Sequence, residues 1–117
     1  MSAWDVAIFN EDDNIDFLDE LSDLDDDEIV EAVRDACLLV LRQPNVNEVE
    51  RLNGLAAATI AAIWAGAPFS AGDVADTYPY IRELIGTGDE SLHEAAAELL
   101  ESVEDDEDVE VFTEALS

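Results

Sequence analysis

Apart from carboxylates, side chains that commonly do chemistry are scarce in this chain. Cys37 is the one cysteine and His93 the one histidine among 117 residues, against 31 Asp and Glu. A nucleophilic Cys–His pair needs the two side chains in contact and a third group that orients the imidazole. Cys37 falls on an apolar helical stripe, where a small buried hydrophobe is expected, and nothing evident orients His93. We therefore predict no catalytic pair and no transition-metal site from these two residues.

Oxygen-bearing side chains near the amino terminus have the spacing that opens a calcium-binding loop. Asp12, Asn14 and Asp16 match the first three ligands of such a loop. Phe17 stands where the loop needs glycine, and Asp23 replaces the bidentate Glu. We therefore interpret these acids as the start of a helix, where the helix dipole favours negative charge. Asp12 and Asp16 remain the candidate metal ligands, and no cofactor is predicted.

Pairs of glutamates at helical spacing suggest an alternative chemistry. Glu28 with Glu31, or Glu98 with Glu101, would place two carboxylates on one helix face, as magnesium-dependent helical pyrophosphohydrolases do. Such enzymes also need basic residues for the substrate phosphates. The basic residues of the chain are Arg34, Arg42, Arg51 and Arg82. Because these are so few, a carboxylate-cluster metal-dependent hydrolase is the alternative function and not the leading one.

Two of the arginines follow a glutamate by three residues. Arg34 comes after Glu31, and Arg51 comes after Glu48. At this spacing on a helix we expect ordinary surface ion pairs, each worth about 0.2–0.5 kcal/mol.

The net charge of the chain is its most unusual property. The formal charge is -27, and there is no lysine. A surface of one sign repels nucleic-acid phosphates and anionic lipid, and it attracts basic patches on other proteins. Two runs concentrate the acids, and we interpret them either as helix caps and solvated turns or as a surface for a basic partner. The runs comprise Asp25, Asp26, Asp27 and Glu28, and Glu104, Asp105, Asp106, Glu107 and Asp108.

The elements that position these residues are predicted to be helices. Residues 1–10 carry aromatic and apolar side chains without helical spacing and are predicted to form an extended arm that packs on the domain. Apolar residues at a period of 3.6 predict helices over Asp13–Leu21, over Asp26–Arg42 and from Glu48 to Ala65, with Asn47 as a cap. The small residues Gly54, Ala58 and Ala62 would let a neighbouring helix approach closely.

The carboxyl-terminal half continues the same pattern. Pro79 begins a predicted short helix through Ile85, Asp89 or Ser91 begins the next, and a last one follows residues 104–108. No segment alternates like a strand. We predict one all-α domain over residues 1–117, a compact bundle of four to six helices around a buried alanine-rich central helix from Leu52 to Ala65.

The amino-terminal segment resembles a known family. Its aromatic and acidic residues are similar to the signature of bacterial proteins grouped as domain of unknown function 4259, and the alanine-rich run over residues 55–63 is similar to the family's middle helix. The resemblance implies a helical fold and a bacterial source, and it transfers no catalytic residue because the family has no established activity. The matching motif positions are Trp4, Phe9, Asp12, Asp16 and Phe17.

These observations lead to a functional expectation. The uncharged stretch over residues 52–72 is interpreted as a buried helix and not as a membrane span, because it is mostly alanine and lacks flanking basic clusters. With one cysteine and no signal-peptide pattern, we expect a cytoplasmic protein. We expect a non-enzymatic interaction protein whose acidic surface binds a basic protein, either as an inhibitor or immunity-like protein or as a mimic of nucleic acid. Direct binding of nucleic acid or membrane is not expected.

Overall fold

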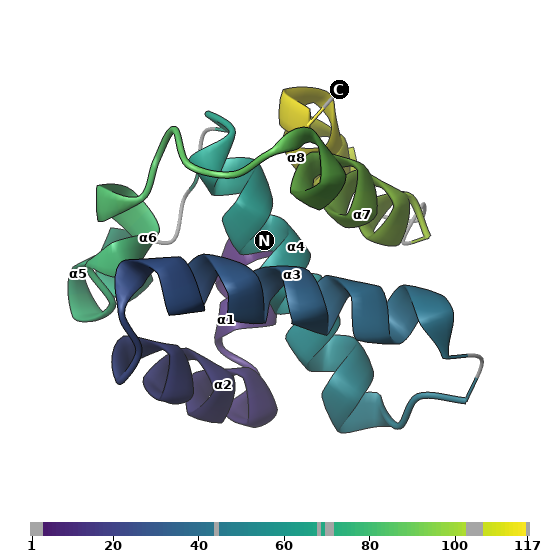
Figure 1. Cartoon of the computed structure of the whole chain (residues 1–117), viewed down its shortest axis with the longest axis horizontal. Coiled ribbons are helices and arrows are strands. Elements are labelled where there is room, and N and C mark those ends of the chain that lie inside the picture. The colour runs from purple at the N-terminus through teal and green to yellow at the C-terminus, as the bar shows by residue number, and fades with distance from the viewer. Residues whose placement is uncertain (1–3, 44, 68, 70–71, 103–106, 117) are drawn as a thin grey trace.

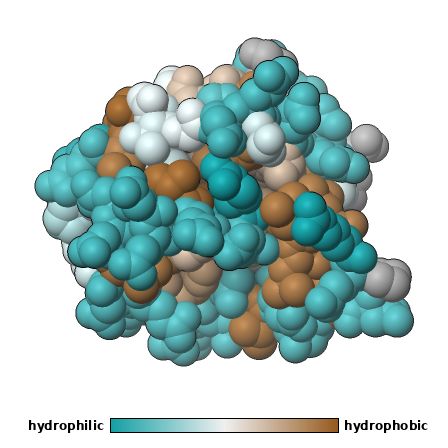
Figure 2. All heavy atoms as spheres, viewed as in Figure 1, coloured by the Kyte–Doolittle hydropathy of each residue, from teal (hydrophilic) through white to brown (hydrophobic). Residues whose placement is uncertain are grey.

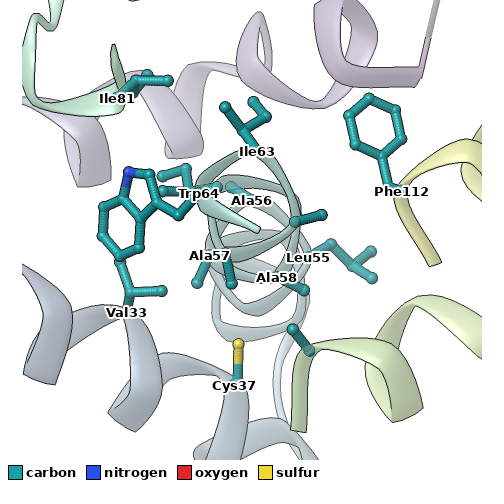
Figure 3. Packing of buried hydrophobic residues seen from close by; sticks show 14 of the residues in the cluster. Val33, Cys37, Leu55, Ala56, Ala57, Ala58, Ile63, Trp64, Ile81 and Phe112 are labelled. Carbon is teal, nitrogen blue, oxygen red and sulfur yellow. The ribbon is translucent and has the colours of Figure 1, made fainter. Parts of the chain in front are cut away.

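The alanine-rich run in the middle of the chain forms the helix around which the others pack. A computed structural model describes residues 4–43, 45–67, 69, 72–102 and 107–116 of the protein. Helix α4 spans Glu48–Trp64, and every one of its residues from Gly54 to Trp64 is buried. Figure 3 looks along α4 and shows its side chains pointing outward on all sides into the surrounding helices. The predicted buried central helix is confirmed.

The described residues are mostly helical and contain no strand, so the predicted all-α class is confirmed. In the described part of the chain, five helices have ten residues or more and three are shorter. The molecule measures 30 × 29 × 29 Å along its principal axes, because the helices surround α4 instead of lining up beside it (Figure 1). The helices besides α4 are α1 (Trp4–Phe9), α2 (Asp12–Ser22), α3 (Asp26–Arg42), α5 (Gly72–Thr77), α6 (Tyr80–Glu83), α7 (Glu90–Glu101) and α8 (Glu107–Leu116).

Local sequence signals explain where the long helices begin. The Asn47 side chain accepts a hydrogen bond from the Glu50 backbone N–H (2.8 Å), and the Glu50 carboxylate accepts one from the Asn47 N–H (3.4 Å). This reciprocal arrangement is a capping box, which satisfies two donors that the first turn of α4 leaves free. Asp89 caps α7 in a similar way, because its carboxylate accepts from the Leu92 N–H at 2.9 Å.

Close packing between α3 and α4 depends on Gly54. A Cβ atom at this position would stand 2.4 Å from Val40 Cγ2 and 3.2 Å from the Ala36 carbonyl oxygen. The missing side chain therefore lets the two backbones approach, as the spacing of small residues on α4 predicted. Cys37, on the same face of α3, is fully buried and donates a weak hydrogen bond to the Gly54 carbonyl (3.9 Å).

The amino-terminal segment corrects one prediction. Residues 4–9 of the expected extended arm form helix α1, which packs against α4 and α2. Among its described side chains, Asp5, Ile8 and Phe9 are buried, and they recur at the spacing of one helical face. The apolar residues alone do not show this face, because one of its three positions is Asp5, an acid that is only 1% exposed.

The buried face of α2 also differs from the predicted one. Leu18 and Leu21 are buried as expected, but Ile15 is 38% exposed and Phe17 is only half-buried. The third fully buried position belongs to Asn14, whose side-chain amide donates a 2.7 Å hydrogen bond to the Ile8 carbonyl. This polar contact joins α2 to the end of α1. The buried face of α2 is therefore rotated relative to the face that the apolar pattern predicted.

Two tyrosines, Tyr78 just before the short helix α6 and Tyr80 at its start, fasten this segment to α2. The Tyr78 hydroxyl donates to the Asp19 carboxylate at 2.6 Å, and the Tyr80 hydroxyl donates to the Leu18 carbonyl at 3.0 Å. Burial and, after it, the Asp19 carboxylate together raise the pKa of Tyr78 to about 12. Burial likewise raises the pKa of Tyr80. Both hydroxyls therefore stay protonated and able to donate well above neutral pH.

Candidate functional site: an acidic face and a groove between α3 and α7

One side of α2 and the amino end of α3 carry a continuous set of exposed acids. On α2, acids at positions 12, 16, 19, 20 and 23 recur at helical spacing opposite the buried positions 14, 18 and 21. The first acidic run follows directly: Asp25 precedes α3, and the other three form its first turn. We call this set the acidic face: Glu11, Asp12, Asp16, Asp19, Glu20, Asp23, Asp25, Asp26, Asp27 and Glu28.

The first acidic run and helix α8, which contains the last two residues of the second run, lie on different sides of the protein (Figure 1). Glu104, Asp105 and Asp106 lie outside the described residues, and Glu107 and Asp108 begin α8. In Figure 1 the amino end of α3 lies at the left of the molecule and α8 at the upper right. The first run therefore belongs to a different side of the protein from α8. The placement of Asp26, Asp27 and Glu28 in the first turn of α3 agrees with the interpretation as helix-start acids.

The arginines pair differently from the prediction. Among the described residues the ion pairs are Arg34–Asp89 at 2.9 Å and Arg82–Asp76 at 2.5 Å. Neither is a pair at helical spacing on one helix, so the predicted Glu31–Arg34 and Glu48–Arg51 pairs are wrong. Arg82 also lies over the Phe69 ring, 5.7 Å from its centroid. Arg34 pairs with an acid far along the chain because Asp89 is already fixed as a helix cap and is therefore held in place.

An open groove runs between α3 and α7, with a volume of about 450 Å³. The two helices run in the same direction in Figure 1, and the Arg34–Asp89 pair links them near one end of the groove. The Leu92 backbone N–H, and then Arg34, hold the pKa of Asp89 below its usual range, so the link stays charged at neutral pH. The groove is lined by Arg34, Leu38, Leu41, Arg42, Asp89, Ser91, Glu94, Ala95 and Glu98.

The floor of this groove is apolar. Leu38 and Leu41 are half-buried against the core, and Ala95 is buried beneath them on the α7 side. In Figure 2 hydrophobic atoms reach the surface over the carboxyl-terminal half of α3, surrounded by hydrophilic ones. Sequence reasoning missed the groove. A signal was present, because residues 38–41 form an apolar run of four that is wider than one packed face of a helix requires.

A second hollow lies beside the first, around the start of α7. Its lining includes Gly88, Glu90, His93 and Leu116. Gly88 has a φ of +115°, which favours glycine, and a Cβ there would stand 3.2 Å from His93 Nε2. His93 therefore packs over the turn that precedes α7, whereas Cys37 faces Gly54 on α4. Burial raises the pKa of the Cys37 thiol to about 12, which disfavours the nucleophilic thiolate at neutral pH.

The residues considered as metal ligands are spread over the surface. Asp12 and Asp16 lie one turn apart on the exposed side of α2, and both belong to the acidic face. Glu28, Glu31, Glu98 and Glu101 are likewise exposed. Within the part of the chain that the structure describes, no three acids, histidines or cysteines gather as a metal ion requires. The arrangement of these residues therefore does not support the alternative function of a metal-dependent hydrolase.

The motif positions of the resemblance divide into packing and surface residues. Phe9 is 1% exposed and Phe17 is half-buried, so both contribute to the core around α1 and α2. Trp4 is the first residue of α1, and its side chain lies outside the described atoms. The buried polar residues Asp5 and Asn14 were not recognised as core positions, although each has helical spacing to buried apolar residues of its own helix: Asp5 to Ile8 and Phe9, and Asn14 to Leu18 and Leu21.

Comparisons with known proteins give a family but no relative of known activity. A family model described as "Domain of unknown function (DUF4259)" matches residues 2–116. No curated protein and no solved structure matches the chain. Within the described residues, none of the helices has the length and hydropathy needed to cross a bilayer.

Proposed function

The chain belongs to the family described as Domain of unknown function (DUF4259), a description that assigns no activity, and we propose from its surface that it binds a basic protein partner. In this proposal it is a bacterial, cytoplasmic and non-enzymatic interaction protein. The acidic face supplies the long-range attraction and the first contact.

The observation that supports this proposal is the exposure of the acidic face without cations nearby in sequence. From Glu11 to Glu28 every acid is exposed except the half-buried Asp13, and no arginine precedes Arg34. The two ion pairs of the described residues use Asp76 and Asp89, which lie outside this face. Apart from Asp19, which accepts a hydrogen bond from Tyr78, the carboxylates of this face can therefore attract a basic partner.

Coulomb attraction explains why the partner should be basic. Exposed charges of one sign raise the rate of encounter with an oppositely charged patch by about 10–1000-fold at low salt, and they repel phosphates. A patch of that kind is found where proteins hold nucleic acid or another anion. The acidic face would cover it, which accounts for the two forms of the proposal, an inhibitor or immunity-like protein and a mimic of nucleic acid.

Affinity capture tests the proposal. The full chain, immobilised through its carboxyl terminus, is exposed to a nuclease-treated lysate of the source cells at about 0.05 M salt and washed stepwise to about 0.5 M. We expect one basic protein to be enriched in stoichiometric amount and released as salt rises. Mixing the purified partner with the chain should then give a single complex by size-exclusion chromatography. Enrichment of neutral or acidic proteins alone would refute the proposal.

A further inference from the structure

We propose that the α3–α7 groove seats an amphipathic helix of the basic partner, with the apolar side of that helix on Leu38, Leu41 and Ala95. This inference rests on the proposed function and adds the place and the kind of contact. It also fixes the charge that the bound helix must carry on each edge and the direction in which it lies.

The floor of the groove favours an apolar side chain. Leu38 and Leu41 already pack partly on the core, so a second apolar surface laid over them removes their remaining exposed area from water. Such burial stabilises the complex by about 25 cal/mol per Å² of apolar surface removed from water. The volume of about 450 Å³ lies within the range of about 300–1,000 Å³ that is typical of pockets for bound ligands.

The two edges of the groove differ in charge. Glu94 and Glu98 follow one another by one turn on α7 and are both exposed, so they form an anionic edge. On α3, Arg34 is held by Asp89, whereas Arg42 is exposed and makes no ion pair with the described residues. An occupant that fits both edges carries Lys or Arg toward α7 and negative charge toward Arg42.

A helix satisfies these requirements better than an extended peptide. An extended segment gains affinity by adding to a strand edge, and no strand is present in the described part of the chain. A helix bonds its own backbone groups internally and needs only an apolar stripe. Arg34 and Arg42 are eight residues apart on α3, which is roughly 12 Å or two helical turns. Because the carboxyl end of a helix carries partial negative charge, that end should lie at Arg42.

Backbone NMR of the isotope-labelled full chain tests the site with a defined probe. The probe is a synthetic helical peptide of about 15 residues with leucines at the spacing i, i+3, i+4 and i+7 and with lysines along one flank. A peptide of the same composition with scattered leucines is the control. We expect the first peptide to shift the amide signals of Leu38, Leu41, Ala95 and Glu98, and the control to leave them in place.

A pair of charge variants separates the groove from the overall charge. Glu94→Gln with Glu98→Gln should weaken binding of the helical peptide about three- to tenfold. Glu83→Gln with Glu110→Gln changes the net charge by the same amount at exposed positions away from the groove, and it should change the affinity less than twofold. Equal effects of the two variants would overturn the proposed site.

The outcomes also distinguish this inference from the function on which it rests. Shifts confined to the acidic face, or no shift at up to about 1 mM peptide, would overturn the groove as the contact site. The capture of a salt-sensitive basic partner would in either case still support the proposed function. A capture experiment that yields no basic protein would instead refute the function, whatever the peptide does.

Discussion

At the scale of single residues, Asn14 shows how a polar side chain can be mistaken for a ligand. Its spacing from Asp12 and Asp16 imitates a calcium loop, yet it lies in the core and donates to the Ile8 carbonyl. Sequence reasoning had no direct sign of this, because a polar residue inside an acidic run is usually on the surface. The 3.6-residue spacing to Leu18 and Leu21 was the available clue.

Replacing Asn14 with alanine should therefore destabilise the protein although no ligand is involved. Asn14→Ala leaves the Ile8 carbonyl without its side-chain donor in a buried place, which costs about 1–3 kcal/mol. Asn10→Ala is the matched control, since Asn10 donates a 2.8 Å hydrogen bond to the Val6 carbonyl but is exposed, and we expect a change within about 0.5 kcal/mol. Urea unfolding of both variants measures the difference. Equal losses would contradict the structural role of Asn14.

The two tyrosines give a prediction about alkaline pH. A raised pKa means that the folded state favours the neutral phenol, so this stabilisation is complete below about pH 10 and is lost as the pH rises through about 12. The phenolate absorbance should stay flat until the protein unfolds and then rise for Tyr78 and Tyr80 together. The protein in denaturant is the control. Titration of either tyrosine near pH 10 in the folded protein would contradict the contacts with α2.

At the scale of helices, sequence patterns predicted the parts whose positions are set locally. The bounds of α3 and the Asn47 cap of α4 follow from apolar periodicity and from residues within one turn, so both were predicted. Helix α1 was missed because one of its buried residues is an acid. The α3–α7 groove was missed because it depends on the Arg34–Asp89 pair, whose members are 55 residues apart.

The close approach of α3 and α4 leads to a prediction for Gly54. Gly54→Ala adds a Cβ that overlaps the stiff side chain of Val40. We expect overpacking to lower the free energy of unfolding by about 1–3 kcal/mol. The higher helix propensity of alanine should offset up to about 1 kcal/mol of this loss. Gly72→Ala is the control, since its nearest contact would be an ordinary 3.8 Å from Arg82. Thermal unfolding should show a lower midpoint for the first variant only, and a stabilised Gly54→Ala would contradict the packing.

At the scale of the whole molecule, a charge of -27 opposes folding by self-repulsion. Added salt screens this repulsion, so the unfolding temperature should rise gradually with sodium chloride, and with magnesium, manganese or calcium chloride at the same ionic strength. A thermal-shift series compares the four salts. A rise that saturates at micromolar concentration of one divalent cation would indicate a specific metal site and would favour the alternative hydrolase.

The proposal assigns binding to the position of the acidic face and not only to the net charge of the protein. Neutralising the first acidic run with Asp25→Asn, Asp26→Asn, Asp27→Asn and Glu28→Gln removes four charges from one place. The matched variant removes four exposed charges from four helices with Glu48→Gln, Glu83→Gln, Glu101→Gln and Glu110→Gln. Both variants have the same net charge, so any difference between them reports the location of the contact.

The most direct test is the dissociation constant of the captured basic partner for the protein and for these two variants, measured by calorimetry at about 0.1 M salt. We predict that the clustered variant binds at least about fourfold more weakly, since its four lost contacts are worth about 0.2–1 kcal/mol each. The scattered variant should stay within about threefold of the unaltered protein. Equal weakening by both variants, or none by either, would contradict the account.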